Sequence, residues 1–453
     1  MEKKLKIFFS GIAGSGVSAI AGFMAEKGNI IAGSDRAFDL HPEHPLKSIF
    51  LSMGIDIAPH QDGSGIDDTF DFAVFSTAVE SDRPDALKAK ASGIPVKTRP
   101  EYLAEITESF NTIAVSGTSG KSTTAGLLAF LMSRLGMEPN FAGGGRVKQF
   151  KSFSNPGNFL AGNSEYLVIE ACESDGTIVN YKPHHSIILN LGLDHHPVIK
   201  TSEMFETLMK NTIKKIIVNA DDENLMRITD KNAVTFSIDN FSQYRAEAIN
   251  YKPFSTDFLL SGREFRLSLP GKYNLYNALS CIALLSELGI SLDAVAGLLP
   301  EFQGIDRRFD VKLNDGQRLV IDDYAHNPHK IASLMETVKR LSESICYIFQ
   351  PHGFAPTRMM KKEYIDVFAK NLRGSDRLIL LSIYYAGGTA SKDISSQDLA
   401  DGIRRQGRSA EVAEDRRDVL KGLQQYRAYV VFGARDESLS DFAGEIAHII
   451  SSS

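Results

Sequence analysis

Two glycines and a lysine lie close together in residues 115–124, which read VSGTSGKSTT. Backbone N–H groups of a glycine turn and of a following helix N-terminus hold anionic oxygens, so this pattern predicts a site for nucleotide phosphates. Lys121 would reach the outer phosphates, and the Ser122 hydroxyl would bind Mg²⁺. The usual longer loop needs glycine where this chain has Val115, so a plain glycine turn with an exposed lysine is the alternative. The residues assigned to the phosphates are Gly117, Thr118, Ser119, Gly120, Lys121, Ser122 and Thr123.

Carboxylates and a histidine follow two other apolar runs. Glu170 ends the run 166–170, and Asp194 and His195 come shortly after the run 186–190. The ends of parallel strands form the edge where ligands bind, and a carboxylate there is a hard oxygen ligand that suits Mg²⁺. Asp194 could orient the His195 ring towards a metal or a phosphoryl group. Glu173, taken alone, is expected to belong to a solvated acidic turn.

Charged pairs also occur later in the chain. Arg307 and Arg308 could bind phosphate through forked hydrogen bonds, and Asp322 and Asp323 could accept protons from ribose hydroxyls. Each pair is equally compatible with an ordinary charged surface.

The elements that must position these residues alternate between strand and helix. Strands are predicted at 4–10, 30–32, 72–75, 94–97, 112–116, 166–170, 186–190, 215–219, 318–323, 346–350, 377–382 and 429–433, with helices such as 125–135 and 274–288 between strands. This alternation predicts an α/β fold with parallel sheets in three domains, 1–107, 108–309 and 310–453. The first domain opens with a βαβ unit whose turn, GIAGSGVS, precedes Asp35.

Length and composition fit this picture. The chain has 453 residues, 43% hydrophobic and 23% charged, with a formal net charge of −6 and only three cysteines at wide spacing. These values favour a cytoplasmic protein and give no reason to expect nucleic acid or membrane as a partner. No apolar run approaches the ~18 residues of a membrane span, and the apolar start is too short for a signal peptide.

Several motifs, taken in order, resemble the Mur ligase family of peptidoglycan synthesis. They are GIAGSGVS, GTSGKSTT, EACESD, the N-x-x-x-D-H of residues 190–195, NLYNALSCIA, GIDRRFD, DDYAHNP and FQPH. The resemblance spans nearly the whole chain and implies an ATP-dependent amide ligase with a Rossmann-like UDP-sugar domain, a central P-loop ATPase domain and a Rossmann-like amino-acid domain. It implies joining an amino acid, most closely L-alanine, to the carboxylate of UDP-N-acetylmuramate through an acyl phosphate.

The resemblance also assigns roles to single residues. Its catalytic set is Lys121, His195, Arg308, His326 and Asn327, and its Mg²⁺ ligands are Ser122, Glu170 and His195. Asn277 would contact adenine, Asp323 the ribose and Arg308 the phosphates of ATP. The UDP-sugar would contact Gly14, Ser15, Gly16, Val17, Ser18, Asp35, Ser76, Thr77 and Ala78, with His60 as a weaker candidate. His352 and Arg358 would bind the amino acid, and the protein would be a monomer or homodimer.

Three departures from the family pattern leave alternatives open. The usual D-H-x-D ends in Pro197, the usual Q-P-H-R ends in Gly353, and the usual D-E-S-D starts with Cys172. A murein-peptide recycling ligase, or a member with another amine or acceptor, is therefore possible. Less favoured are a dinucleotide-binding oxidoreductase, suggested by the first glycine turn alone, and a nucleotide-binding protein that has lost catalysis.

Overall fold

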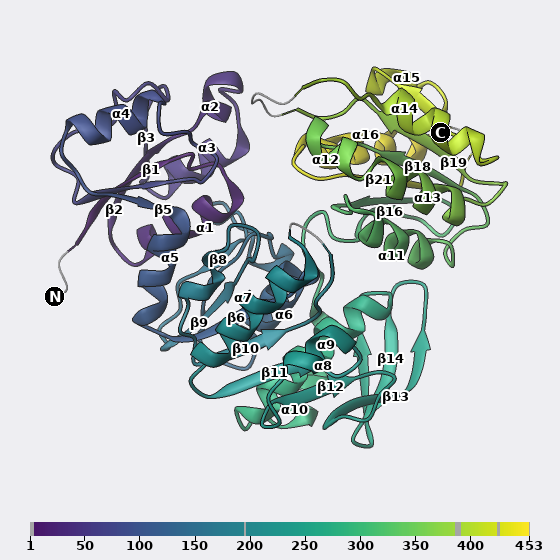
Figure 1. The fold of residues 1–453 in the computed structure, drawn as a ribbon, viewed down its shortest axis with the longest axis horizontal. Helices are drawn as coiled ribbons and strands as arrows, with labels where there is room; N and C mark the ends of the chain where they lie inside the picture. Colours follow the sequence, from purple (N-terminus) through teal and green to yellow (C-terminus); the bar gives the residue numbers. More distant parts are fainter. Residues whose placement is uncertain (1–3, 194–195, 386–390, 424–425, 453) are drawn as a thin grey trace. The chain divides into compact units, whose positions relative to one another are not determined.

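Three sheets flanked by helices make up the protein, as Figure 1 shows, so the predicted α/β fold is confirmed. This computed structural model describes residues 4–193, 196–385, 391–423 and 426–452. The chain separates into two compact units, Met1–Gly304 and Ile305–Ser453. The first unit contains two of the sheets and the second contains the third.

The first sheet is fully parallel and has the strand order β3-β2-β1-β4-β5. Its strands are β1 (Lys6–Ser10), β2 (Ile30–Ser34), β3 (Asp56–Ile57), β4 (Phe72–Phe75) and β5 (Val96–Thr98). Its helices are α1 (Ser15–Glu26), α2 (Arg36–Leu40), α3 (Pro45–Ser52), α4 (Pro84–Ala91) and α5 (Arg99–Glu108). The glycine turn therefore connects β1 to α1, as the predicted βαβ unit requires.

The second sheet has the order β15-β14-β13-β12-β11-β10-β6-β9-β7-β8. Its strands are β6 (Asn111–Ser116), β7 (Asn140–Ala142), β8 (Phe159–Leu160), β9 (Tyr166–Glu170), β10 (His185–Ile188), β11 (Lys215–Asn219), β12 (Val234–Ser237), β13 (Tyr244–Tyr251), β14 (Thr256–Leu260) and β15 (Arg263–Leu267). Its helices are α6 (Lys121–Arg134), η1 (Lys148–Phe150), η2 (Thr177–Asn180), α7 (Val198–Asn211), α8 (Glu223–Ile228), α9 (Lys272–Glu287), α10 (Leu292–Leu298) and η3 (Leu299–Glu301). The antiparallel strands β13 to β15 were not predicted from the sequence.

The third sheet has the order β16-β17-β21-β18-β19-β20 and is parallel except for the β16–β17 pair. Its strands are β16 (Asp310–Asn314), β17 (Leu319–Asp323), β18 (Ile345–Phe349), β19 (Arg377–Leu381), β20 (Glu411–Ala413) and β21 (Ala428–Phe432). Its helices are α11 (Pro328–Val338), α12 (Phe354–Met359), α13 (Lys361–Asn371), α14 (Ser396–Arg405), α15 (Arg416–Leu420) and α16 (Ser438–Ser451).

Burial on both faces explains the continuous apolar strands at the centre of each sheet. Every residue of β10, β17, β18 and β21 is buried, and so are five of the six residues of β6. Helix α6 is also buried along its middle, from Thr123 to Met132, because it lies against both β9 and α9. The phosphate loop is thus carried by two of the most buried elements of the first unit.

The first sheet is attached closely to the second within the first unit. A Cβ added at Gly22 of α1 would lie 2.3 Å from the Phe159 ring of β8. Beside this contact, Asn158 donates from Nδ2 to Ser15 O and to Ser18 Oγ, both at 2.9 Å. Glycine at position 22 therefore lets helix α1 approach β8 directly.

His185, buried in β10, gives the first unit a predicted acid sensitivity. Burial, with the nearby cations Lys214 and Lys215, lowers its pKa from 6.5 to about 4. Between these two pKa values the unfolded chain binds a proton at His185 and the folded protein does not. The contribution of His185 to the free energy of unfolding is therefore fully present above pH 6.5. It is lost as the pH falls towards 4, by up to about 3 kcal/mol. We expect His185→Phe to flatten this slope in urea unfolding at pH 7, 5.5 and 4.5.

His60→Phe is the matched control for that measurement, because the His60 side chain is 69% exposed. It should keep the wild-type slope. A His185→Phe protein that loses stability with acid as steeply as the wild type would contradict the prediction.

Across the described part of the chain, no helix combines the length and the apolar character needed to cross a lipid bilayer.

Candidate active site

The phosphate loop connects β6 to α6, as predicted, and its two glycines adopt conformations that other residues avoid. Gly117 has a φ of +138° and Gly120 a φ of +90°. A Cβ at Gly120 would lie 2.4 Å from Asn277 Oδ1, so this position also lacks space for a side chain. The loop therefore requires glycine at 120 for two independent reasons. Asn277, predicted to contact adenine, lies against the loop and is only 4% exposed.

Asn190 holds the loop in shape, a role that the sequence analysis did not assign. Its Oδ1 accepts from Thr118 Oγ1 at 2.7 Å and from Ser119 N at 2.8 Å, and its Nδ2 donates to Ser119 O at 3.0 Å. Asn190 follows β10, the neighbour of β6 in the sheet, so its amide faces the loop. The signal available in the sequence was an amide at the end of a predicted buried strand.

We expect Asn190→Ala to raise the KM for ATP by about tenfold, because the loop loses three hydrogen bonds and its backbone donors lose their alignment. Steady-state kinetics at varied ATP would measure the effect. The control is Asn224→Ala, since Asn224 Nδ2 bonds Leu191 O in the same region at 3.0 Å but does not bond the loop. An unchanged KM in Asn190→Ala would contradict the assigned role.

Lys121 is the first residue of α6, and its ammonium group is held inside the loop. Its Nζ donates to Gly117 O at 2.6 Å and to Glu173 Oε2 at 2.9 Å. The Lys121 side chain is 14% exposed and that of Glu173 is 1% exposed. The expectation of a solvated turn at Glu173 is therefore wrong, because this carboxylate is buried as the counter-ion of the loop lysine.

Ser122 and Glu170 lie together, as the metal prediction requires. The Ser122 hydroxyl donates to Glu170 Oε2 at 2.8 Å, while Glu170 Oε1 accepts from Gly145 N at 3.2 Å. These are hard oxygen donors of the kind that Mg²⁺ prefers, so the residues present fit the ion. Among the described residues no group of three His, Cys, Asp or Glu side chains could hold a metal. Asp194 and His195 lie outside the described residues, so the His195 assignment stays a prediction.

The predicted UDP-sugar residues converge at the carboxyl edge of the first sheet. The turn at Gly14, Ser15, Gly16 and Val17 leads into α1, and residues 76–78 directly follow β4. A Cβ at Gly11 would lie 2.8 Å from Ser76 Cβ, so glycine there lets the two segments meet. Ser76, Thr77 and Ala78 stay predictions as ligand contacts.

Two of these predicted UDP-sugar residues also have structural bonds. The Asp35 carboxylate accepts from Ala13 N and Ala37 N, both at 2.8 Å, which fixes the turn and caps α2. Burial raises the pKa of Asp35. Ser18 is 1% exposed, and its hydroxyl donates to Ser15 O at 2.9 Å. The weaker candidate His60 is exposed, with Nδ1 3.3 Å from Asp39 Oδ1.

Asp85 stabilises this edge of the first sheet through hydrogen bonds, and the sequence analysis did not single it out. It is 1% exposed, and it accepts hydrogen bonds from the hydroxyls of Ser10 and Ser34 at the ends of β1 and β2. Gly63 N donates to its other oxygen at 2.9 Å. This buried carboxylate fixes the strand ends from which the glycine turn and Asp35 emerge.

In the second unit, Asp323 fixes the segment that carries the arginines. Its oxygens accept from Phe309 N and Ala325 N, both at 2.7 Å, and burial raises its pKa. Arg307 is buried and donates to Asp436 O at 2.9 Å and Gly433 O at 2.7 Å, so this arginine anchors the main chain. The Arg308 guanidinium lies 4.7 Å from the centre of the Tyr324 ring.

Two predicted histidines meet in the same unit. His326 follows β17 and His352 follows β18, and their ring centroids are 5.2 Å apart in an edge-to-face arrangement. Asn327 caps α11 by accepting from Lys330 N at 2.9 Å. Arg358, the predicted partner of the amino-acid carboxylate, donates from Nε to Asp393 Oδ1 at 2.9 Å.

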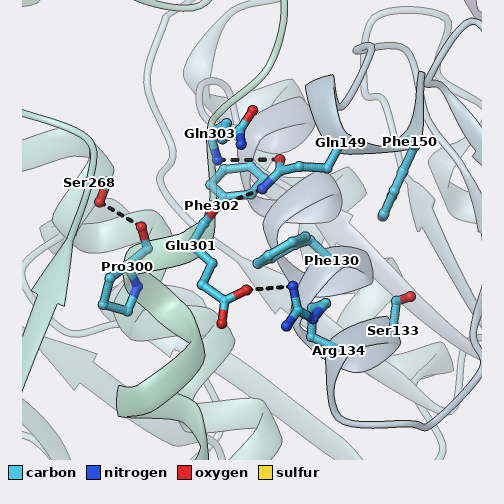
Figure 2. Close-up of a pocket in the computed structure, with 10 residues that line it drawn as sticks. All are labelled: Phe130, Ser133, Arg134, Gln149, Phe150, Ser268, Pro300, Glu301, Phe302 and Gln303. Atoms are coloured by element: carbon cyan, nitrogen blue, oxygen red, sulfur yellow. Dashed lines mark hydrogen bonds and ion pairs between the residues drawn. The ribbon is translucent and has the colours of Figure 1, made fainter. Parts of the chain in front are cut away.

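A cavity of about 870 Å³ in the first unit lies away from these groups. Figure 2 shows Phe130, Ser133 and Arg134 among the residues that line it. These three residues belong to the C-terminal half of α6, whereas the phosphate loop precedes the N-terminus of that helix. Lys121 and Arg134 are thirteen positions apart along α6, which corresponds to roughly 20 Å. Gln149 and Arg134 bind residues 301–303 across this cavity. The cavity therefore lies against the last residues of the first unit and is not part of the phosphate site.

Comparison with known families matches almost the whole chain in three consecutive parts. Residues 6–111 match the catalytic domain of the Mur ligase family, residues 115–285 the Mur ligase middle domain, and residues 307–448 the Mur ligase glutamate ligase domain.

Individual relatives agree with this match. The UDP-N-acetylmuramate–L-alanine ligase of Caldanaerobacter subterraneus is 30% identical over 94% of this chain and 93% of its own length. The crystal structure of the UDP-N-acetylmuramate–alanine ligase of Thermotoga maritima is similar with a TM-score of 0.82 and 27% identity, covering 99% of both chains. The murein peptide ligase of Psychrobacter arcticus shares the fold, with a TM-score of 0.70 and 21% identity over 99% of both chains.

Proposed function

This chain belongs to the Mur ligase family and is an ATP-dependent ligase that adds L-alanine to UDP-N-acetylmuramate in peptidoglycan synthesis, and we propose that its phosphate loop performs the ATP half of that reaction. One observation carries this assignment: a largely enclosed lysine, Lys121, is held inside a glycine loop beside the Ser122–Glu170 pair. Because the chain belongs to this family, we set aside the dinucleotide-binding oxidoreductase and the non-catalytic nucleotide-binding protein.

The chemistry explains why a lysine is needed at this place. A free carboxylate has no acceptable leaving group, so ATP first transfers its γ-phosphoryl group to the muramate carboxylate, forming an acyl phosphate and ADP. The amine of alanine then attacks the acyl carbon, and phosphate leaves with the C–O electron pair. Lys121 would stabilise the negative charge that moves between two anions in the first step.

Mg²⁺ is the cofactor that Ser122 and Glu170 would hold, with His195 as the third protein ligand. When bound, it would neutralise charge on the phosphates. The chain's own contribution is to orient two oxygens: Glu170 is fixed by Gly145 N at 3.2 Å and in turn fixes the Ser122 hydroxyl.

The second unit would supply the remaining groups. Arg308 would contact the phosphates, Asp323 the ribose, and His326 and Asn327 the reacting phosphoryl group. His352 and Arg358 would bind the amino acid, and Arg358 would have to exchange Asp393 for the substrate carboxylate. The hydrogen bond from Phe309 N to Asp323 fixes the segment that carries Arg308, and this supports the role proposed for Arg308.

The substrate residues at Gly14–Ser18, Asp35 and Ser76–Ala78 would bind the UDP-sugar through the donors of the glycine turn. We propose a cytoplasmic monomer or homodimer without a nucleic-acid or membrane partner. A murein-peptide ligase is the second candidate, favoured only by the departures at Pro197 and Gly353.

The test is to incubate the purified protein with ATP, Mg²⁺, UDP-N-acetylmuramate and single amino acids, following phosphate release and product mass. We expect an amide product with L-alanine. A parallel reaction with a murein tripeptide in place of L-alanine separates the second candidate. Product only with the tripeptide would overturn the L-alanine assignment.

A further inference from the structure

Glu173 is a buried carboxylate that is only half satisfied. Its Oε2 pairs with Lys121 Nζ at 2.9 Å, whereas its Oε1 is buried with no hydrogen-bond partner among the described residues. A buried ion pair with an unpaired oxygen adds little to stability, because desolvation offsets the attraction between the charges. The pair therefore calls for an explanation in terms of the reaction.

The geometry suggests one. Lys121 must reach the phosphates of ATP, yet its ammonium is engaged by Gly117 O and by Glu173. The Glu173 carboxylate places an anionic oxygen against this ammonium, as a phosphate would. If a phosphate bound Lys121 while the Glu173 carboxylate stayed in place, two anions would lie together in one buried space and repel each other.

We propose that Glu173 is a positioning residue that holds Lys121 inside the phosphate loop and is displaced by a nucleotide phosphate. Glu173 then competes with ATP for Lys121, and the segment 172–176 leaves the loop when the nucleotide binds. This inference rests on the proposed function, because it requires Lys121 to bind phosphate.

A neighbouring carboxylate provides a matched control. Asp175 belongs to the same acidic segment, but its Oδ2 pairs with Arg99 Nη2 at 2.9 Å. Its Oδ1 accepts from Thr177 N at 3.1 Å. Asp175→Asn therefore removes the same formal charge from the same segment without touching the Lys121 pair.

The first experiment measures ADP binding by isothermal titration calorimetry in the full-length wild type and both variants. We expect Glu173→Gln to bind ADP about tenfold more tightly, because the competing charge-assisted bond is lost, and Asp175→Asn to bind like the wild type. A merely structural role would not give this result, since damage to the site weakens binding.

The second experiment needs no variant. Hydrogen–deuterium exchange of the wild type with saturating ADP should show faster exchange in residues 172–176 and slower exchange in residues 118–124. Equal or weaker ADP binding by Glu173→Gln, or protection of residues 172–176 by ADP, would overturn the proposal. If the wild type fails to bind ADP at all, the proposed phosphate site fails as well.

Discussion

Lys121→Ala should lower kcat for amide formation by at least about 10³-fold, the largest effect expected for any single substitution in this chain. The ammonium group is the only positive charge that the described loop residues 117–123 present to a phosphate. Its removal leaves the charge that develops during phosphoryl transfer without this partner. Phosphate release and product mass, followed with UDP-N-acetylmuramate and L-alanine, would measure the loss.

Two controls separate chemistry from folding in this experiment. Lys210→Ala removes a lysine that is 76% exposed and should keep wild-type turnover. Lys121→Ala also leaves Glu173 buried without its cation, so the double variant Lys121→Ala/Glu173→Gln restores the balance of charge. We expect the double variant to recover thermal stability but not turnover. Turnover within tenfold of the wild type in either Lys121 variant would refute the catalytic assignment.

Gly120→Ala is expected to weaken ATP binding by at least about 100-fold, the second largest effect. At a φ of +90° any side chain is strained, and the new Cβ would lie 2.4 Å from Asn277 Oδ1 and 3.0 Å from Leu189 Cδ1. Relief of both contacts would move the loop backbone and the predicted adenine contact together. ADP titration and the KM for ATP would show the change.

Gly297→Ala in α10 is the corresponding control, since a Cβ there would meet nothing within 4 Å. In a helix this replacement should stabilise the fold by about 0.5–1 kcal/mol and leave ADP affinity unchanged. If Gly120→Ala bound ADP as tightly as Gly297→Ala does, the proposed strain at the loop would be wrong.

The phosphate loop and its flanking elements could be predicted because their signals are local. A buried strand, two glycines and an apolar helix follow one another between residues 111 and 134, so β6 and α6 could be located from spacing alone. The expected helix began at residue 125, whereas α6 begins at Lys121, because the glycine turn ends directly at the helix. The family resemblance named Ser122 and Glu170 together as Mg²⁺ ligands, and the Ser122 hydroxyl donates to Glu170 Oε2 at 2.8 Å.

What could not be predicted depends on contacts between distant residues. Glu173 is buried in an ion pair with Lys121, 52 residues earlier in the sequence, and Asn190 acts on the loop because β10 is the neighbour of β6. Asp85 is likewise defined by hydroxyls at the ends of β1 and β2. An acidic turn and a single asparagine have many possible surroundings, and sequence spacing does not distinguish among them.

The close approach of α1 to β8 bears on how far the protein can be divided. Gly22 faces the ring of Phe159, and Asn158 bonds the first turn of α1, so α1 packs against residues that lie beyond the first sheet in the sequence. A fragment ending near residue 107 would expose the apolar face of α1 to water and lose the bonds from Asn158. Such a fragment would make a poor substitute for the intact first unit in ligand screening, whereas a fragment ending at Gly304 retains the contacts that complete it.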